Sequence, residues 1–314
     1  ETAASVVREK PDGTGEILSN VVSSQIEEHK EFGGVVPEIA ARAHVEKIEF
    51  IIKKALKESN LDLNNINGIS ATAGPGLIVC LTVGLNAGKA IAGSLKKPFV
   101  AVNHLEGHAL SPKINNKIKF PYLLLLISGG HTQFLEVNGV NNYKRLGTTI
   151  DDALGEAFDK TAKLLGIEFP GGPKIEEWAK KGNENYFKLP KPILKKGGCN
   201  LSFAGLKTAV LRTSKELKNQ KEKYHLAASF QKTINEILYE KTKIAMKEFL
   251  KNKKDIQKTF VIAGGVAANL KIRENLTELA KEKKFSSFFP PINLCSDNAA
   301  MIAWAGIERY KINL

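Results

Sequence analysis

The sequence predicts an α/β fold made of two similar lobes. The chain has 314 residues, which is enough for two lobes of roughly 150 residues each. Short apolar runs alternate with longer amphipathic segments, as in proteins whose central strands are largely parallel. This alternation follows a predicted strand hairpin in each half of the chain. No repeat with a period of 20–50 residues is present, so a solenoid is not expected.

The first half begins with the first of these hairpins. Its strands are expected at residues 2–8 and 16–23, joined by Pro11-Asp12-Gly13, whose residue types favour a turn. A helix is expected from Pro37 to about residue 57, because proline is favoured at the first helical position. The remaining elements are a strand, a helix and a strand at residues 66–73, 78–94 and 99–102.

The second half begins with an apolar run at residues 122–127 that is typical of a buried strand. The other expected strands are at residues 131–137, 143–149 and 259–263. Helices are expected at residues 151–165, 173–181, 206–215, 224–251, 266–281 and 297–311. We therefore expect a first lobe at residues 1–115 and a second at 116–314. The second lobe would contain a helical insertion around 170–225, and its last helix would pack back toward the first lobe.

The composition is that of an ordinary globular protein with an excess of positive charge. Hydrophobic residues make up 43% and charged residues 25% of the chain, and the net charge is +13. A basic protein favours polyanionic partners such as nucleic acid, although lysine-rich solvated surfaces give the same balance. Much of the excess lies in runs at residues 191–196, 215–223 and 251–258.

The cysteines and the apolar runs exclude two other classes of protein. Three cysteines without regular spacing, Cys80, Cys199 and Cys295, argue against a disulfide scaffold. No run of 18 consecutive apolar residues occurs, so no transmembrane helix and no membrane partner are expected. No signal peptide is visible.

Two histidines four residues apart form the first candidate site. His104 and His108 would lie on one face of a helix, a spacing that can hold one metal ion. Leu105 occupies the place where zinc proteases carry glutamate. Gly107 costs about 1 kcal/mol in a helix interior, so another constraint should account for it. Two polar histidines beside a loop remain an alternative, and a metal would need a third ligand.

Glycine turns after predicted strands form the second candidate site. They are Gly74-Pro75-Gly76, Ser128-Gly129-Gly130 and Gly264-Gly265. Glycine lets a backbone approach a phosphate, and the next helix offers free N–H groups. Since none of the turns matches the P-loop or the dinucleotide fingerprint, a Walker ATPase or a dehydrogenase is not expected.

Acidic residues could complete either site. Asp151, Asp152, Glu156 and Asp159 fall on one predicted helix, either as a solvated first turn or as ligands for a ribose or a divalent ion. Asp297 precedes the last predicted helix, as its N-cap or as a metal ligand that faces the histidines.

Taken together, these motifs resemble the TsaD family, which transfers a threonylcarbamoyl group to an adenine of tRNA. The matching blocks occur in the family's order and cover most of the chain. They are Gly33-Gly34-Val35-Val36-Pro37-Glu38, Asn103-His104-Leu105-Glu106-Gly107-His108, Ser128-Gly129-Gly130-His131-Thr132, the segment 151–160, Pro170-Gly171-Gly172-Pro173, Ser202-Phe203-Ala204-Gly205-Leu206-Lys207, Ala263-Gly264-Gly265-Val266-Ala267-Ala268-Asn269 and Cys295-Ser296-Asp297-Asn298.

The resemblance implies an actin-like fold with two lobes around a nucleotide cleft, as in sugar kinases and heat-shock chaperone ATPases. It implies that His104, His108 and Asp297 hold one divalent metal ion per subunit, with Fe²⁺ as the first choice and Zn²⁺ as the alternative. It also implies an adenylate site. The residues of that site are Leu126, Ile127, Ser128, Gly129, Gly130, Asp159, Gly172, Glu176 and Asn269.

The implied reaction is acyl transfer from threonylcarbamoyl-AMP to N6 of the adenine on the 3′ side of the anticodon, in tRNAs that read codons starting with adenine. Our hypothesis is that the metal acts as Lewis acid and template, while N–H groups of Gly129 and Gly130 stabilise developing charge. The adenine amine is the nucleophile and AMP leaves. No residue is identified as a general base.

The resemblance also implies partners and a location. Besides tRNA and threonylcarbamoyl-AMP, bacterial members work with an actin-like scaffold subunit of TsaB type and a small ATPase of TsaE type. A bacterial cytoplasm is the expected location. The alternative is a mitochondrion or plastid, where members of the family work as homodimers. Only Glu1-Thr2 stands for the family's usual first motif, and the usual Arg-Pro-Arg-Trp-like tail is missing. We therefore expect a fragment that lacks the first strand.

Three other functions remain open at this point. Paired histidines also occur in metal-dependent peptidases, although the missing glutamate after His104 argues against one. A non-catalytic actin-fold scaffold subunit would not need both histidines and Asp297. A sugar or acetate kinase of the same fold would bind ATP without the histidine pair.

Overall fold

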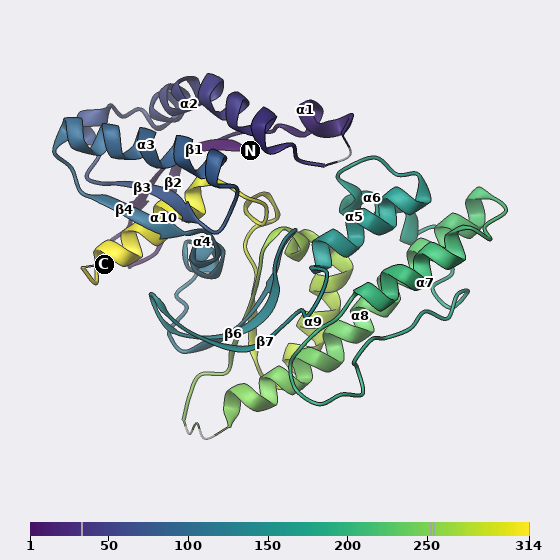
Figure 1. Cartoon of the computed structure of the whole chain (residues 1–314). Helices are drawn as coiled ribbons and strands as arrows, with labels where there is room; N and C mark the ends of the chain where they lie inside the picture. The colour runs from purple at the N-terminus through teal and green to yellow at the C-terminus, as the bar shows by residue number, and fades with distance from the viewer. Residues whose placement is uncertain (33, 252, 254, 314) are drawn as a thin grey trace. The chain divides into compact units, whose positions relative to one another are not determined.

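The computed structural model describes residues 1–32, 34–251, 253 and 255–313. The chain divides into two compact units (Figure 1). Unit 1 comprises Glu1–Ile118 and the segment that starts at Asp297, and unit 2 comprises Lys119–Ser296. Both units combine helices with strands, so the predicted α/β class is confirmed. The assignment of lobes at residues 1–115 and 116–314 remains a prediction.

Unit 1 contains an antiparallel hairpin and a parallel strand pair. In the hairpin, β1 (Thr2–Glu9) pairs with β2 (Gly15–Ser23). The turn between them is held by Asp12, whose carboxylate accepts hydrogen bonds from the backbone N–H and the hydroxyl of Thr14. The parallel pair consists of β3 (Ile69–Gly74) and β4 (Phe99–Asn103), and α3 (Ile78–Leu95) connects them.

The helices of unit 1 come from both ends of the chain. They are α1 (Ile26–Lys30), α2 (Pro37–Ser59), α3, α4 (His104–Leu110) and α10 (Ala299–Tyr310), with short 3₁₀ turns η1 (Leu63–Asn65) and η2 (Ser111–Lys113). α2 starts with proline at its first position, as predicted, and ends at Asn60 in the left-handed conformation. α10 contacts β1, β3 and α4, and its Trp304 is fully buried.

Unit 2 is built on a five-stranded sheet with the order β7-β6-β5-β8-β9. The strands are β5 (Tyr122–Ile127), β6 (Thr132–Gly139), β7 (Asn142–Thr148), β8 (Thr259–Ala263) and β9 (Ser286–Phe288). β5, β8 and β9 are parallel, whereas β5, β6 and β7 are antiparallel. The sheet is therefore mixed rather than largely parallel, because the consecutive hairpins β5-β6-β7 supply three of its five strands. β5 lies at its centre and is fully buried, as its apolar sequence predicted.

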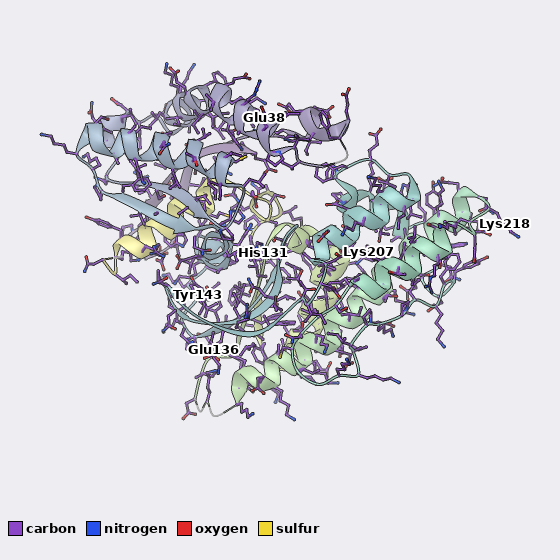
Figure 2. The ribbon with its side chains drawn as sticks, in the orientation of Figure 1. Glu38, His131, Glu136, Tyr143, Lys207 and Lys218 are labelled. Atoms are coloured by element: carbon purple, nitrogen blue, oxygen red, sulfur yellow. The ribbon has the colours of Figure 1, made fainter. Side chains whose placement is uncertain are left out.

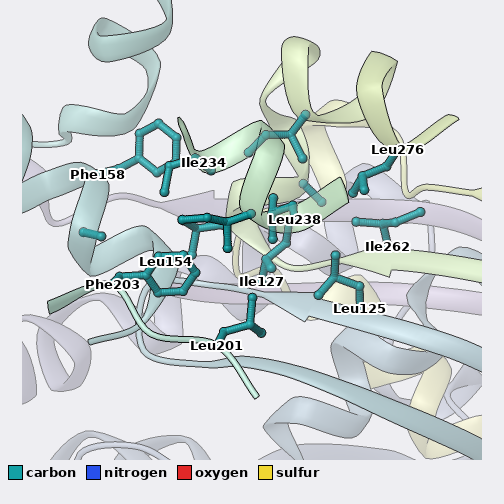
Figure 3. Packing of buried hydrophobic residues seen from close by; sticks show 14 of the residues in the cluster. Leu125, Ile127, Leu154, Phe158, Leu201, Phe203, Ile234, Leu238, Ile262 and Leu276 are labelled. Carbon is teal, nitrogen blue, oxygen red and sulfur yellow. The ribbon is translucent and has the colours of Figure 1, made fainter. Parts of the chain in front are cut away.

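The core of unit 2 lies where helices cover this sheet. The helices and 3₁₀ turns are α5 (Leu154–Leu165), α6 (Gly171–Ala179), α7 (Ala204–Ser214), α8 (Gln220–Leu250), η3 (Gly265–Ala268), α9 (Leu270–Glu282) and η4 (Ile292–Leu294). Leu125 and Ile127 of β5 pack with residues of β8, α5 and α8 (Figure 3). Phe158 of α5 meets Phe230 of α8 edge to face, with 5.1 Å between the ring centroids.

Two helix predictions were wrong in detail. The single helix expected at residues 266–281 is divided into η3 and α9, because Asn269 is extended and its side chain caps α9 by accepting from Ile272 N–H. The helix expected from residue 151 begins at Leu154. Its extended N-cap is Ala153, whose N–H donates to Glu156.

Within the described part of the chain, α3 is long and apolar enough to cross a membrane by length and composition. The search for an unbroken apolar run did not predict this, because Thr82, Asn86 and Lys89 interrupt the run. Of the helix residues, Gly88 and Ala92 are buried. One helix that passes this test does not by itself indicate a membrane protein.

The core packing yields a stability prediction. Phe158 is 2% exposed, so the change Phe158→Ala leaves a cavity beside Phe230. We expect it to lower the free energy of unfolding by about 3–5 kcal/mol in urea denaturation. The matched control is Phe50→Ala on α2, where the side chain is 65% exposed and the loss should stay below about 0.5 kcal/mol. Equal losses in the two variants would contradict this description of the core.

Candidate functional site

The two histidines lie on α4, which begins at the first of them. The side chain of Asn103 caps this helix by accepting hydrogen bonds from the N–H groups of Leu105 and Glu106. Because the helix starts at His104, His104 and His108 are one turn apart on the same face. Their rings meet edge to face, with 4.9 Å between the ring centroids.

Asp297 completes a group of three possible metal ligands in unit 1. Its Oδ1 lies 3.1 Å from Nε2 of His108 and 3.4 Å from Nε2 of His104. One ligand atom from each of the three side chains lies within 4.8 Å of the other two. The structure thus brings the three predicted ligands together, and the group could hold a metal ion.

The donor set suits a catalytic metal. Two imidazole nitrogens and one carboxylate oxygen leave coordination positions open, as in non-haem iron(II) sites and catalytic zinc sites. His108 is fully buried, and its Nδ1 has no hydrogen-bond partner in the described part of the chain. Its Nε2 therefore makes the contact to Asp297, and the residues present fit a divalent ion.

Charges around the group shift the pKa values of its members. Desolvation alone would raise the pKa of Asp297, but hydrogen bonds to His104 and His108 hold it well below its usual range. Burial alone would lower the pKa of His104, but the carboxylates of Asp297 and Glu1 outweigh it, and the pKa is raised. Burial, followed by the charge of Asp297, raises the pKa of Glu1. No pattern in the sequence predicted that Glu1 lies near this group.

The packing of α4 against α10 explains the glycine between the histidines. A Cβ atom at Gly107 would lie 2.8 Å from Cδ1 of Ile302 and 3.3 Å from Cγ of Met301, so both side chains would have to move. The N-cap of α10 is Asn298, which accepts from Met301 N–H. The expectation of an N-cap role for Asp297 is therefore wrong, and its carboxylate faces the histidines instead.

In unit 2 the glycine turns lie at the ends of neighbouring parallel strands. Ser128-Gly129-Gly130 follows β5, and Gly264-Gly265 follows β8. A Cβ atom on Gly129 or Gly130 would meet nothing within 4 Å, so space is open beside this backbone. The backbone N–H of His131 (Figure 2) donates to the Ser128 hydroxyl and fixes the turn. The Ser128-Gly129-Gly130 turn therefore has the exposed backbone that an anion site requires, whereas Gly264 is buried against the backbone of Ile127.

Helix ends connect the other predicted adenylate residues of unit 2. Asp159 accepts from the N–H of Gly171, and hydrogen bonds from Gly171 and Gly172 only partly offset the effect of burial, which raises its pKa. Glu176 accepts from the N–H groups of Leu270 and Lys271 at the start of α9. The carboxylates of Asp159 and Glu176 thus stabilise the N-termini of α6 and α9.

Asn269 is held at the same end of α9. Its Oδ1 accepts from Ile272 N–H, and its Nδ2 donates to Gln231, a buried residue of α8 that the sequence did not single out. The side chains of Leu126 and Ile127 are fully buried, so these two residues could offer a ligand only backbone atoms. Of the glycine block near the start, Gly33 lies outside the described residues.

The predicted acidic cluster does not form on one helix. Asp151 precedes α5 and accepts hydrogen bonds from Ser202 and from the N–H groups of Phe203 and Ala204 at the start of α7. The carboxylate of Asp152 forms ion pairs with Lys160 and with Lys207 (Figure 2). The first two acidic residues therefore connect the segment before α5 to the start of α7.

Sequence comparison identifies the family. A sequence model described as "TsaD: tRNA N6-adenosine threonylcarbamoyltransferase" matches residues 16–304. The chain is 67% identical over 312 residues to the tRNA N6-adenosine threonylcarbamoyltransferase of Pelagibacter ubique, an alignment that covers 99% of this chain and 87% of that protein. This chain belongs to the TsaD family. It is also 52% identical over 317 residues to the enzyme of the same name from Chelativorans sp. strain BNC1, covering 100% of this chain and 88% of that one. The expected family and transferase class are confirmed.

Comparison with solved structures identifies the fold. The chain is similar to full-length HypF in its phosphate- and nucleotide-bound form, with a TM-score of 0.58 and 14% identity over 86% of this chain and 41% of HypF. HypF from T. kodakarensis gives a TM-score of 0.60, also at 14% identity, over 86% of this chain and 43% of that one. The chain thus spans about two fifths of the HypF structures. These likenesses confirm the actin-like fold that the TsaD resemblance implied.

The charges of the ligand group predict how metal affinity depends on pH. A metal ion can bind His104 only if the imidazole has lost its proton, so protons compete with the metal for this ligand. Because the pKa of His104 is raised, this competition begins at a higher pH than for a histidine with a pKa near 6.5. Apparent Zn²⁺ affinity, measured by chelator competition, should fall about tenfold per pH unit as the pH drops below that pKa. A constant affinity between about pH 8 and pH 6 would contradict the role of His104.

Gly155 gives a prediction for the glycine turn of unit 2. A Cβ atom at this position would lie 2.7 Å from Cα of Gly129 and 2.8 Å from the carbonyl oxygen of Ser128, so Gly155→Ala must displace the turn. We expect AMP affinity in titration calorimetry to fall about tenfold, or about 1.4 kcal/mol. Gly197→Ala is the control, because its Cβ atom would meet nothing within 4 Å. Unchanged AMP affinity in Gly155→Ala would contradict a role of the Ser128-Gly129-Gly130 turn in nucleotide binding.

Proposed function

We propose that this protein transfers the threonylcarbamoyl group of threonylcarbamoyl-AMP to N6 of the tRNA adenine on the 3′ side of the anticodon. The observation that carries the proposal is the convergence of His104, His108 and Asp297 in a chain that is 67% identical to a tRNA N6-adenosine threonylcarbamoyltransferase. A catalytically inactive relative would have no need to keep these three side chains in ligand geometry.

In this proposal Nε2 of His104, Nε2 of His108 and a carboxylate oxygen of Asp297 hold one divalent ion, Fe²⁺ as the first choice and Zn²⁺ as the alternative. The two-histidine, one-carboxylate set supports iron, because it is the common ligand set of non-haem iron(II) enzymes. When bound, the ion would supply Lewis-acid polarisation of substrate oxygens. Asp297 would remain ionised throughout, since its pKa is held well below its usual range.

Unit 2 would bind the adenylate. We assign the phosphate to the N–H groups of Gly129 and Gly130, because open space adjoins this backbone. Asp159, Gly172, Glu176 and Asn269 would line the nucleoside. The tRNA adenine amine attacks the threonylcarbamoyl carbonyl carbon and a C–N bond forms. The bond between that carbon and the phosphate oxygen breaks, AMP leaves with the electron pair, and the amine releases one proton to solvent. The described side chains identify no general base.

The partners follow from the same proposal. Exposed lysines such as Lys195, Lys196 and Lys218 (Figure 2) could contact tRNA phosphates. We propose an actin-like scaffold subunit of TsaB type and a small ATPase of TsaE type as protein partners, in a bacterial cytoplasm, as the bacterial relatives suggest. The apolar start of α3 supports a protein partner in unit 1, because Ile78 is 80% exposed.

The peptidase alternative loses support from the geometry. A zinc peptidase uses a glutamate beside its histidine pair as the base. Here Leu105 occupies that place, and Glu106 forms an ion pair with Arg309 rather than facing the histidines.

A transfer assay tests the proposal. The protein, TsaB-type and TsaE-type partners, threonylcarbamoyl-AMP and unmodified tRNA are combined, and the digested nucleosides are analysed by mass spectrometry. We expect threonylcarbamoyladenosine from the parent and none from His104→Ala, because that variant loses a metal ligand. His44→Ala is the matched control, since its Nδ1 contacts Thr2 and Gln25 outside the ligand group, and it should keep the activity. Full activity in metal-free His104→Ala would overturn the role of the metal.

A further inference from the structure

The ion pair between Glu106 and Arg309 joins the metal-ligand helix α4 to the last helix α10. Nη1 of Arg309 lies 2.7 Å from Oε2 of Glu106. We infer that this ion pair is a positioning device that sets the rotation of α4 about its own axis, and thereby the metal affinity of the site. The inference rests on the proposed metal role of His104, His108 and Asp297.

The helical spacing places the ion pair opposite the metal ligands. Each residue turns an α-helix by about 100°, so His104 and His108 are separated by about 40° around the axis. Glu106 lies about 200° from either histidine, which is the far side of the helix. Rotation of α4 that moved the imidazoles away from Asp297 would therefore also pull Glu106 away from Arg309 or press it against its surroundings.

Burial makes this attachment strong. The side chain of Glu106 is 2% exposed and that of Arg309 is 17% exposed. Loss of the arginine would take a charge-compensating partner away from a buried carboxylate, which is less favourable than the intact pair. The rotation that keeps Glu106 against Arg309 is therefore strongly favoured over others.

α4 needs such anchors because it is short. It has seven residues, and helices of this length are not stable on their own. α10 attaches to it on two sides: Asp297 precedes the first turn of α10 and contacts the histidines, and Arg309 lies in its last turn and holds Glu106. Between these points Gly107 packs against Ile302. Attachments on opposite sides of the helix resist rotation about its axis more strongly than an attachment on one side.

The test compares two buried ion pairs of similar exposure, one between α4 and α10 and the other in unit 2. Glu106→Gln keeps the shape of the side chain and removes its charge. The matched control is Glu136→Gln on β6 in unit 2 (Figure 2), where a carboxylate that is 8% exposed lies 2.8 Å from Nζ of Lys253. Zn²⁺ affinity is measured by chelator competition on protein shown to be folded by circular dichroism, and the visible spectrum of bound Co²⁺ reports the coordination geometry.

We expect Glu106→Gln to weaken Zn²⁺ binding about 10–100-fold and to change the Co²⁺ spectrum. Arg309→Met should do the same, and the double variant should lose no more than either single variant, because both changes remove one interaction. Glu136→Gln should lose stability but keep Zn²⁺ affinity and the Co²⁺ spectrum. If Glu106→Gln is too unstable to fold, Arg309→Lys gives the same comparison, because it keeps the charge but its shorter side chain weakens the contact to Glu106.

Zn²⁺ affinity of Glu106→Gln within about twofold of the parent would overturn the inference, as would an equal loss in Glu136→Gln. The same experiment separates this outcome from failure of the proposed function. A parent protein that binds Zn²⁺ only when His104 is intact establishes the site, whether or not the transfer assay succeeds. A parent whose Zn²⁺ binding does not depend on His104 would overturn the metal role and the inference together.

Discussion

The packing of α4 against α10 joins residues that are 189 positions apart in the sequence, and the candidate metal site exists only through it. Asn103 starts α4 at His104, and Asn298 starts α10 just after Asp297, so both helix caps fix where the ligands emerge. The side-chain amides of Asn103 and Asn298 thus place His104 inside the first turn of α4 and Asp297 just before the first turn of α10. Gly107 then permits the close approach of the two helices. The site is therefore built from ordinary helix-capping and packing rules applied at one crossing.

Unit 2 also depends on capped helix ends and close backbone packing, here around its glycine turns. The Ser128-Gly129-Gly130 turn and the Gly264-Gly265 turn end adjacent parallel strands, and the neighbouring helices begin beside them. Carboxylate and amide side chains of this region satisfy helix N-termini, as Glu176 does for α9. Such groups can exchange a backbone partner for a ligand at little cost in hydrogen bonds. The residues that stabilise these helix ends are thus the same ones that the proposed adenylate site would use.

The sequence predicted the strands and helices well where local chemistry decides. β5 is a run of six apolar residues and is buried throughout, and α2 begins at the predicted Pro37. Prediction was wrong where a tertiary contact decides: Asp151 and Asp152 lie outside α5 because distant segments use their carboxylates. The break between η3 and α9 depends on the side chain of Asn269, which a continuous helical pattern conceals. Arg309 and Glu1 gave no local signal, since their partners are far away in the chain.

Sequence patterns alone were enough to predict the α/β class, the order of the elements and, through the spacing of the motifs, the resemblance to the TsaD family. These properties follow from local periodicity, from turn chemistry and from the order of blocks along the chain. Three contacts became known from the folded chain alone: Asp297 faces His104 and His108, Glu106 turns away toward Arg309, and Gly155 touches the glycine turn. The physical reason is that such contacts depend on how helices pack, and packing is set by the shapes of many side chains together rather than by any one segment.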